Sequence, residues 1–141
     1  MIRNLYLSLT IIICLPVLIA GCGDSKEAAR KQLQEKISIE DFCKLQKEIV
    51  DIGMMNYYDL IKNKKTTDAV KELEKYRKEV DTVLKKHDLD LKTLINYKRV
   101  FNREIENYLS RNPEMNWNAS PEQMEFNNLF SGFLKRSLGL K

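Results

Sequence analysis

The stretch SIEDFCKLQKEIVDIGMMNYYDLIK (residues 38–62) decides the fold of this chain. Ser38 is a suitable helix N-cap, with Asp41 at the third helical position, and Ile37 and Phe42 are spaced as a hydrophobic staple. Beyond this start, apolar side chains recur every three or four residues, as in an amphipathic helix. They form two adjacent rows, which are Phe42, Leu45, Ile49 and Ile52, and Cys43, Val50, Met54, Tyr57 and Ile61. Such a wide apolar face predicts one long helix that packs against more than one other helix.

Three further helices are predicted after this one. The second begins at Thr66–Asp68, the third spans about 91–111, and the fourth begins at Ser120 and ends at Gly139. The start at Ser120 is well marked, because Pro121 follows the N-cap and Gln123 stands at the third helical position. The side chains expected to face inward are Val70, Leu73, Tyr76, Val80, Val83, Leu84 and His87, then Leu94, Phe101, Ile105 and Tyr108, and finally Met124, Leu129, Phe130, Phe133, Leu134 and Leu138.

The fold class follows from this pattern and from what the sequence lacks. No stretch alternates between apolar and polar residues as a half-buried strand does. The 141 residues contain only 5 Gly and 3 Pro, which leaves little scope for the many tight turns of a β-sandwich. Short connections between helices favour antiparallel neighbours. We expect an all-α domain over residues 38–141, a small up-down bundle of about four helices.

The first 21 residues have the layout of an export signal. Arg3 lies in a short polar start, and residues 5–20 are almost entirely apolar and uncharged. At about 16 residues the apolar run is shorter than the roughly 20 that a membrane-spanning helix needs. We therefore expect a signal peptide over residues 1–21.

The end of this segment, Ile19-Ala20-Gly21-Cys22, resembles the lipobox of bacterial lipoproteins. The resemblance implies cleavage after Gly21 and attachment of a diacylglyceryl and an N-acyl group to Cys22, which anchors the protein in a membrane of the cell envelope. Because Gly23 rather than Asp follows the cysteine, it favours the outer membrane in a Gram-negative host. The alternatives are an ordinary secretory signal with an incidental cysteine, and an uncleaved membrane anchor. The remainder of the chain resembles no particular family.

Residues 22–37 are rich in Lys, Glu and Ala and read as a tether between the lipid and the domain. Loss of Arg3 with the signal would leave 23 basic and 20 acidic side chains in the chain. This excess is small and dispersed, and it lacks the basic stripe of a nucleic-acid-binding protein. The composition therefore excludes nucleic acid as an expected partner.

Residues suited to catalysis or metal binding are sparse. The chain has one histidine, and its glycines form no phosphate-binding loop. Cys43 lies in an apolar row and is predicted to be a small buried side chain. The alternatives are a disulfide between two chains and a reactive pair with His87. We interpret His87 as a residue that packs at the end of its helix. The alternative is a metal site that His87 forms with Asp88 and Asp90. We expect no enzymatic activity, no metal and no cofactor beyond the lipid on Cys22.

Two features suggest a surface for another protein. Met54, Met55, Tyr57 and Tyr58 follow Gly53, and Met-rich surfaces adapt readily to a partner. The competing interpretation is a close helix crossing at Gly53 with Met54 and Tyr57 in the core.

Trp117, the single tryptophan, lies in the longest predicted loop. It either folds back onto the end of the bundle or forms an exposed contact with a partner. Together these features predict a non-enzymatic, membrane-anchored lipoprotein with a protein-binding or assembly role in the envelope. A carrier of a small ligand or lipid between the helices, and a structural spacer, are the alternatives.

Overall fold

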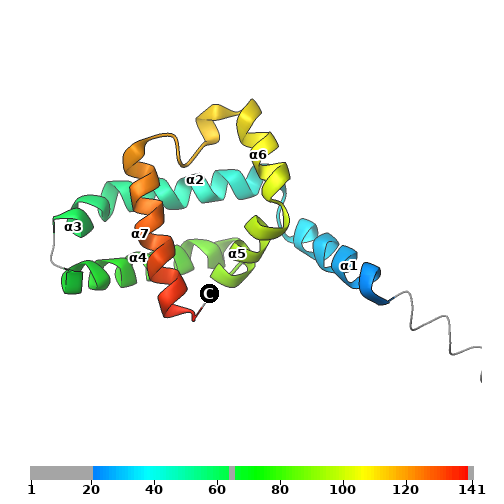
Figure 1. Cartoon of the computed structure of the whole chain (residues 1–141), viewed down its shortest axis with the longest axis horizontal. Helices are drawn as coiled ribbons and strands as arrows, with labels where there is room; N and C mark the ends of the chain where they lie inside the picture. The colour runs from blue at the N-terminus through cyan, green and yellow to red at the C-terminus, as the bar shows by residue number, and fades with distance from the viewer. Residues whose placement is uncertain (1–20, 64–65, 140–141) are drawn as a thin grey trace, which may run out of the picture. The chain divides into compact units, whose positions relative to one another are not determined.

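The structure is a computed structural model that describes residues 21–63 and 66–139, with side chains placed from residue 25 onward, Thr66 excepted. The described residues form seven α-helices and one 3-10 turn and contain no strand, so the all-α prediction is confirmed (Figure 1). The elements are α1 (Gly21–Lys36), α2 (Ile39–Asn56), α3 (Tyr58–Lys62), α4 (Thr66–Lys86), α5 (Leu91–Val100), α6 (Asn102–Arg111), η1 (Pro113–Met115) and α7 (Pro121–Ser137).

The chain divides into two compact units, residues 1–35 and residues 36–141. The predicted signal segment, residues 1–20, lies outside the described residues, and of Gly21 and Cys22 only the backbone is described. In the first unit, the segment expected as a tether is helical in α1. All other helices belong to the second unit.

Helix starts follow the local sequence closely. The Ser38 hydroxyl accepts a hydrogen bond from the backbone N–H of Asp41 at 3.1 Å, as a capping side chain does. At α7, Ser120 and Gln123 form both hydrogen bonds of a capping box, at 3.1 and 3.0 Å. Asp90 caps α5 by accepting from the N–H of Thr93 at 2.6 Å. Short polar side chains thus satisfy backbone donors that the first turn leaves free.

Two of the predicted long helices are each interrupted once. The helix expected over residues 38–62 bends at Tyr57, and the one expected over 91–111 bends at Phe101. Backbone hydrogen bonding continues on both sides, since Tyr57 donates to the carbonyl of Gly53 and accepts from Ile61, each at 2.9 Å. In a straight helix adjacent side chains point about 100° apart. Tyr57 and Tyr58 accordingly contact two different helices, α4 and α7.

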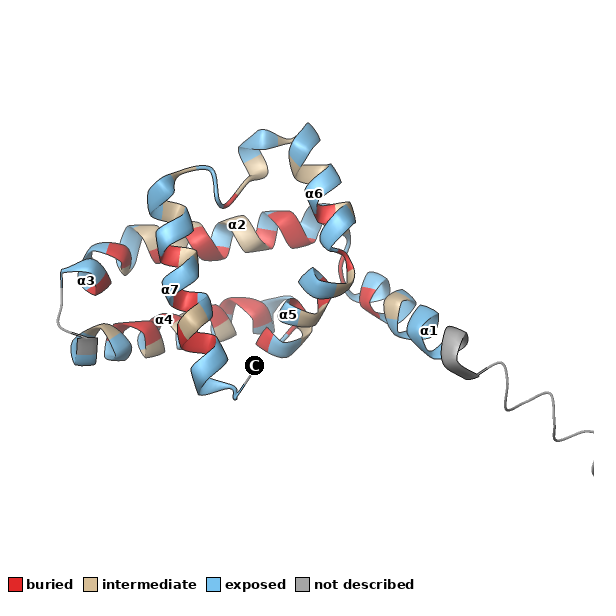
Figure 2. Cartoon of the chain, viewed as in Figure 1, coloured by how far each residue is buried: buried red, intermediate tan, exposed pale blue. Residues whose placement is uncertain are grey.

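Helix α7 crosses over α2 and α4 and contacts both (Figure 1). The crossing is close because Gly53 has no side chain. A Cβ atom at Gly53 would overlap the ring of Phe126 and lie 2.9 Å from Cζ of Tyr76. The close crossing at Gly53 is therefore confirmed, whereas Met54 and Tyr57, which the same interpretation placed in the core, are half-buried. Figure 2 shows the buried residues gathered along α2, α4 and α7, where these helices meet.

Five residues expected to face inward are exposed instead. Val70, Met124, Leu129 and Leu138 have 43%, 47%, 40% and 44% of their surface exposed, and His87 is also exposed. In α7 the apolar residues surround the helix, and only one stripe faces α2 and α4, namely Phe126, Phe130, Phe133 and Leu134. At His87 the reason is different. Helix α4 ends at Lys86, so His87 lies past the helix, and Leu89 is the residue buried there instead.

Buried hydroxyl groups are paired inside the core. The Tyr76 hydroxyl donates to the carbonyl of Ile49 at 2.6 Å, and the Tyr97 hydroxyl donates to the carbonyl of Ile37 at 3.0 Å. Among the described residues, no buried side-chain nitrogen or oxygen lacks a hydrogen-bond partner. The large aromatic core is therefore free of the penalty for unpaired buried polar groups.

Candidate protein-binding surface

The outer side of α2 carries an open groove. It is lined by residues three or four positions apart along the helix, together with one residue from η1, namely Lys44, Lys47, Glu48, Asp51, Ile52, Met55 and Met115. Helical spacing of three and four places these side chains on one side of α2. Contacts between α2 and η1 bring Met115 to the same place. The groove is therefore built by one regular helix and by a turn held against it.

The apolar part of the groove consists of Ile52, Met55 and Met115. Met55 has 78% of its surface exposed, the largest exposure among the large hydrophobic side chains that the structure describes. Ile52 and Met115 are half-buried. Burying a side chain of this size contributes about 1.5–3 kcal/mol. Methionine is also flexible and adapts its shape to an apolar partner.

Both lysines that line the groove form ion pairs with carboxylates of the same helix. Lys47 lies 2.5 Å from the carboxylate of Asp51, and Lys44 lies 2.6 Å from that of Glu40. Such exposed pairs contribute about 0–1 kcal/mol each. Glu48, which also lines the groove, belongs to neither pair. The groove is therefore suited to an apolar side chain or the apolar ridge of a helix, framed by charges that keep the site soluble when empty.

The structure separates the residues predicted to contact a partner. Met55 lies in the groove and Met54 is half-buried. Tyr57 is also half-buried, and its hydroxyl donates to Glu79 of α4 at 2.7 Å, a bond that raises the pKa of Tyr57 to about 12. The Tyr58 hydroxyl donates to Glu125 of α7 at 2.7 Å. Both tyrosines therefore hold α3 against its neighbours, and of this group Met55 alone lines the groove.

Trp117 is in the core rather than on the surface. The indole is 3% exposed, and its ring meets the ring of Phe42 edge-on at 6.2 Å between centroids. The carbonyl of Trp117 accepts a hydrogen bond from the side chain of Asn127 at 3.2 Å. The burial of Trp117 therefore agrees with its fold-back interpretation and not with an exposed contact. Tyr58, which is 7% exposed, is corrected as a surface contact, because its ring also packs between helices.

Sequence reasoning missed six of the seven residues that line the groove, all except Met55. The apolar periodicity places Ile52 in the inward row, and Lys44 and Lys47 have the pattern of ordinary surface lysines. Met115 belongs to a loop, and the contact between that loop and α2 depends on how the chain returns from α6. The signal available in the sequence was Met115, two residues before Trp117. A loop with two large apolar residues is expected to pack at least one of them against the domain.

Cys43 and His87 offer no reactive pair. Cys43 is fully buried, and burial raises the pKa of its thiol to about 11, so the reactive thiolate is disfavoured. The prediction of a small buried side chain is confirmed at Cys43. His87 is exposed, which corrects the expectation that it packs at the helix end. Within the described residues, no three His, Cys, Asp or Glu side chains are grouped as metal ligands.

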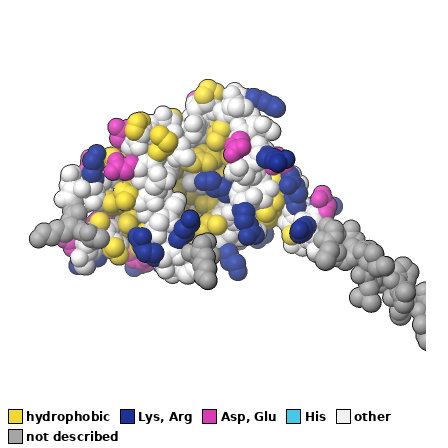
Figure 3. Space-filling view, in the orientation of Figure 1, with side chains coloured by type: hydrophobic (Ala, Val, Ile, Leu, Met, Phe, Trp, Pro, Cys, Tyr) yellow, Lys and Arg dark blue, Asp and Glu magenta, His cyan; other side chains and the backbone are white. Residues whose placement is uncertain are grey.

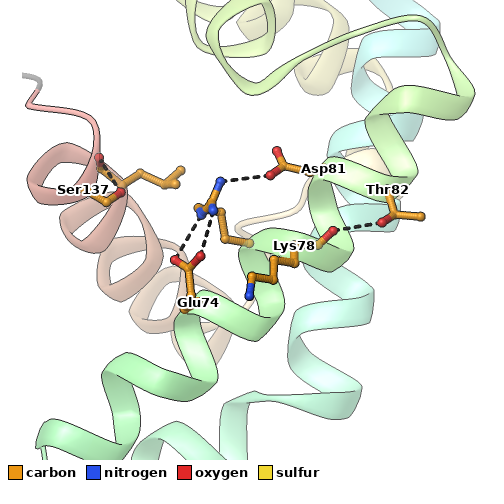
Figure 4. Close-up of polar contacts among 7 residues, drawn as sticks. Glu74, Lys78, Asp81, Thr82 and Ser137 are labelled. Carbon is orange, nitrogen blue, oxygen red and sulfur yellow. Dashed lines mark hydrogen bonds and ion pairs between the residues drawn. The ribbon is translucent and has the colours of Figure 1, made fainter.

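A polar network on α4 links three side chains of that helix. Arg77 donates to Glu74 at 2.7 and 3.1 Å and to Asp81 at 2.9 Å, between the two carboxylates shown in Figure 4. These bonds to Arg77 lower the pKa of Glu74. Ser137 of α7 lies close by and bonds to the carbonyl of Leu134 in its own helix. All of these are pairs at helical spacing, and they support the helix surface rather than a reaction.

Comparisons with known proteins give no relative: no protein-family profile, no curated protein and no solved structure matches the chain.

None of the helices within residues 21–63 and 66–139 combines the length and the apolar character required to cross a membrane.

Proposed function

We propose that this protein is a lipid-anchored, non-enzymatic component of the bacterial cell envelope that binds another envelope protein. The observation that carries the proposal is the N-terminal pattern, an uncharged apolar run of about 16 residues that ends in Ile19-Ala20-Gly21-Cys22. In this proposal Cys22 carries the acyl chains after cleavage behind Gly21. Two or three acyl chains hold a protein on a bilayer firmly, whereas one binds only marginally.

The binding role is assigned to the groove on α2. Met55 is its most exposed apolar side chain, and both lysines that line it are paired with carboxylates of α2. The partner in this proposal presents an apolar residue or helix ridge to Met55, Ile52 and Met115. The description of the domain as an up-down bundle of about four helices belongs to the same proposal, with α2–α3 and α5–α6 each counted as one interrupted helix.

The anchoring is tested by metabolic labelling with palmitate. Wild-type protein is expected to incorporate the label and to yield a mature chain that begins at an acylated Cys22. A Cys22→Ala variant should incorporate none and should retain residues 1–21. Equal labelling of the two chains, or an unmodified wild-type chain, would contradict the proposed anchoring.

The binding role is tested with a photocrosslinking amino acid placed at Met55. The matched control is the same amino acid at Leu60, which is 43% exposed and lies outside the groove. We expect one envelope protein to crosslink from position 55 and not from position 60. Once that protein is identified and purified, Met55→Asp should weaken its binding at least tenfold and Leu60→Asp should not. Equal crosslinking from both positions would argue against the groove.

A further inference from the structure

The charged residues of the domain are unevenly distributed along the chain. Residues 91–103 contain Lys92, Lys98 and Arg99 among their basic residues, and they contain no Asp or Glu. Residues 126–139 contain Lys135 and Arg136 and again no acidic residue. The rest of the chain carries all 20 acidic side chains, so these two segments differ sharply in charge from their surroundings.

The fold gathers these segments on one face. In Figure 3, Lys and Arg side chains collect over α5 and the C-terminal half of α7, and that part of the surface shows few acidic side chains. We call Lys92, Lys98, Arg99, Lys135 and Arg136 the basic face. All five side chains are exposed. None of them forms an ion pair with a carboxylate among the residues that the structure describes.

Lys98 differs from an ordinary surface lysine. Its ammonium lies 5.9 Å from the centre of the Trp117 ring, over the aromatic face. Partial removal from water lowers the pKa of Lys98, and no carboxylate compensates for the lost hydration. Because a charge without a partner is costly away from water, an external anion beside Lys98 would be bound favourably.

Apolar side chains are interspersed with these charges. Ile95 is 37% exposed and lies three residues from both Lys92 and Lys98, on the same side of α5. On α7, Leu129 is 40% exposed and precedes Arg136 by seven residues, which places the two side chains on the same side of the helix. Basic and aliphatic residues on one surface are the combination that binds an anionic bilayer, since the charges attract headgroups and the aliphatic groups enter the interface.

We propose that the basic face docks the domain on a bilayer that contains anionic phospholipids. This inference rests on the proposed function, because the lipid on Cys22 keeps the domain beside a bilayer and so makes a weak contact effective. The bilayer is favoured over an acidic protein because the exposed aliphatic side chains beside the charges, Ile95 and Leu129, come from two different helices, α5 and α7. Each can insert between headgroups as a single side chain.

The test uses the acylated protein reconstituted into vesicles of phosphatidylcholine, with or without 30% phosphatidylglycerol. A nitroxide label is attached to Ile95→Cys or, as a control, to Leu60→Cys. Either new cysteine is the accessible thiol, since Cys22 is acylated in this preparation and Cys43 is buried. Collisions of the label with a water-soluble nickel complex report contact with the bilayer. We expect phosphatidylglycerol to reduce collisions several-fold at position 95 and to leave position 60 unchanged.

Charge dependence separates docking from general crowding at the vesicle. Each basic residue close to an anionic surface contributes about a fivefold gain in association. Lys135→Gln with Arg136→Gln should therefore restore nickel access at position 95, as should 1 M salt, where the screening length is about 3 Å. The control pair Lys71→Gln and Lys75→Gln removes the same charge from lysines that are already paired with carboxylates and lie outside the groove, and it should restore nothing.

The outcomes distinguish this inference from the proposed function. Equal nickel access at position 95 in both vesicles would overturn the docking, even if Cys22 is acylated. Protection at position 95 that occurs only in native membranes would assign the face to a protein and would also overturn it. If Cys22 carries no acyl group, the proposed function fails. Docking is then judged by co-sedimentation of the full Cys22→Ala chain, which should still prefer phosphatidylglycerol vesicles and weaken 10- to 30-fold with the Lys135 and Arg136 changes.

Discussion

The two ends of α2 contact two aromatic clusters that are built in opposite ways. Near its N-terminus the helix supplies a large side chain, Phe42, whose ring stacks on Tyr97 at 4.7 Å and meets Trp117 at 6.2 Å. Near its C-terminus the residue at the helix crossing is Gly53, which has no side chain. Gly53 leaves a gap in the helix surface, and Phe126 and Tyr76, whose rings lie 5.1 Å apart, fill it.

The difference shows two ways in which one helix can be held in a core. At the Phe42 end, stability depends on the apolar area that the side chains bury together. At the Gly53 end, it depends on how closely the backbone allows α7 to approach. The first cluster is therefore sensitive to the removal of atoms, and the second is sensitive to their addition.

The largest expected effect is at the Phe42 end. Trp117→Ala should reduce the free energy of unfolding by about 3–5 kcal/mol, because it leaves a cavity against Phe42. Unfolding in urea, followed by circular dichroism of the full chain, measures the loss. Met55→Ala is the control, and as a change to an exposed residue it should stay within about 0.5 kcal/mol. A loss below 1 kcal/mol for Trp117→Ala would mean that the indole is not packed in the core.

A smaller loss of stability is expected at the Gly53 end, where the addition of one methyl group should destabilise the fold. Gly53→Ala should destabilise the protein by about 2–3 kcal/mol, because the new Cβ forces Phe126 and Tyr76 apart. The matched control is Gly132→Ala in α7, where the nearest atom to a new Cβ is a guanidinium nitrogen of Arg136 at 3.7 Å. That variant should be neutral or more stable by up to about 1 kcal/mol. If the two variants behave alike, the close crossing is not required for stability.

The smallest expected effect concerns alkaline pH at Cys43, which neighbours Phe42. Burial raises the thiol pKa from 9.0 to about 11. Because the folded pKa is the higher one, this contribution to stability is fully present below pH 9 and is lost as the pH rises through 11. Between pH 8 and pH 10 the loss is about 1.4 kcal/mol, the value of one pKa unit.

Denaturant unfolding at the two pH values tests this expectation. Cys43→Ala should lose about 1.4 kcal/mol less than wild type over the same interval, whatever its stability at pH 8. Equal pH dependence in the two chains would show that the thiol does not titrate with unfolding.

The candidate groove could be predicted from the sequence only in part. The sequence predicts Met55 as a partner contact because a methionine pair follows a glycine, which is a local signal. Ile52 was assigned to the core because it continues the row of Phe42, Leu45 and Ile49. The periodicity does not show how much of a helix side is covered, and Ile52 is only half-buried although the adjacent Gly53 is packed against Phe126 and Tyr76. Met115 reaches the groove through a contact between α2 and η1 that no local pattern contains.

The sequence by itself determined the helical class, the capped starts at Ser38 and Ser120, and the burial of Cys43. These properties depend on residues within one or two turns of each other, so local spacing and hydrogen bonding decide them. Only the tertiary structure decided that Tyr57 and Phe101 interrupt their helices, that Trp117 lies inside and that Leu129 lies outside. It also decided that two acid-free segments share one face. Each of these depends on which distant helix covers a given side, and the apolar pattern of a single helix does not contain that information.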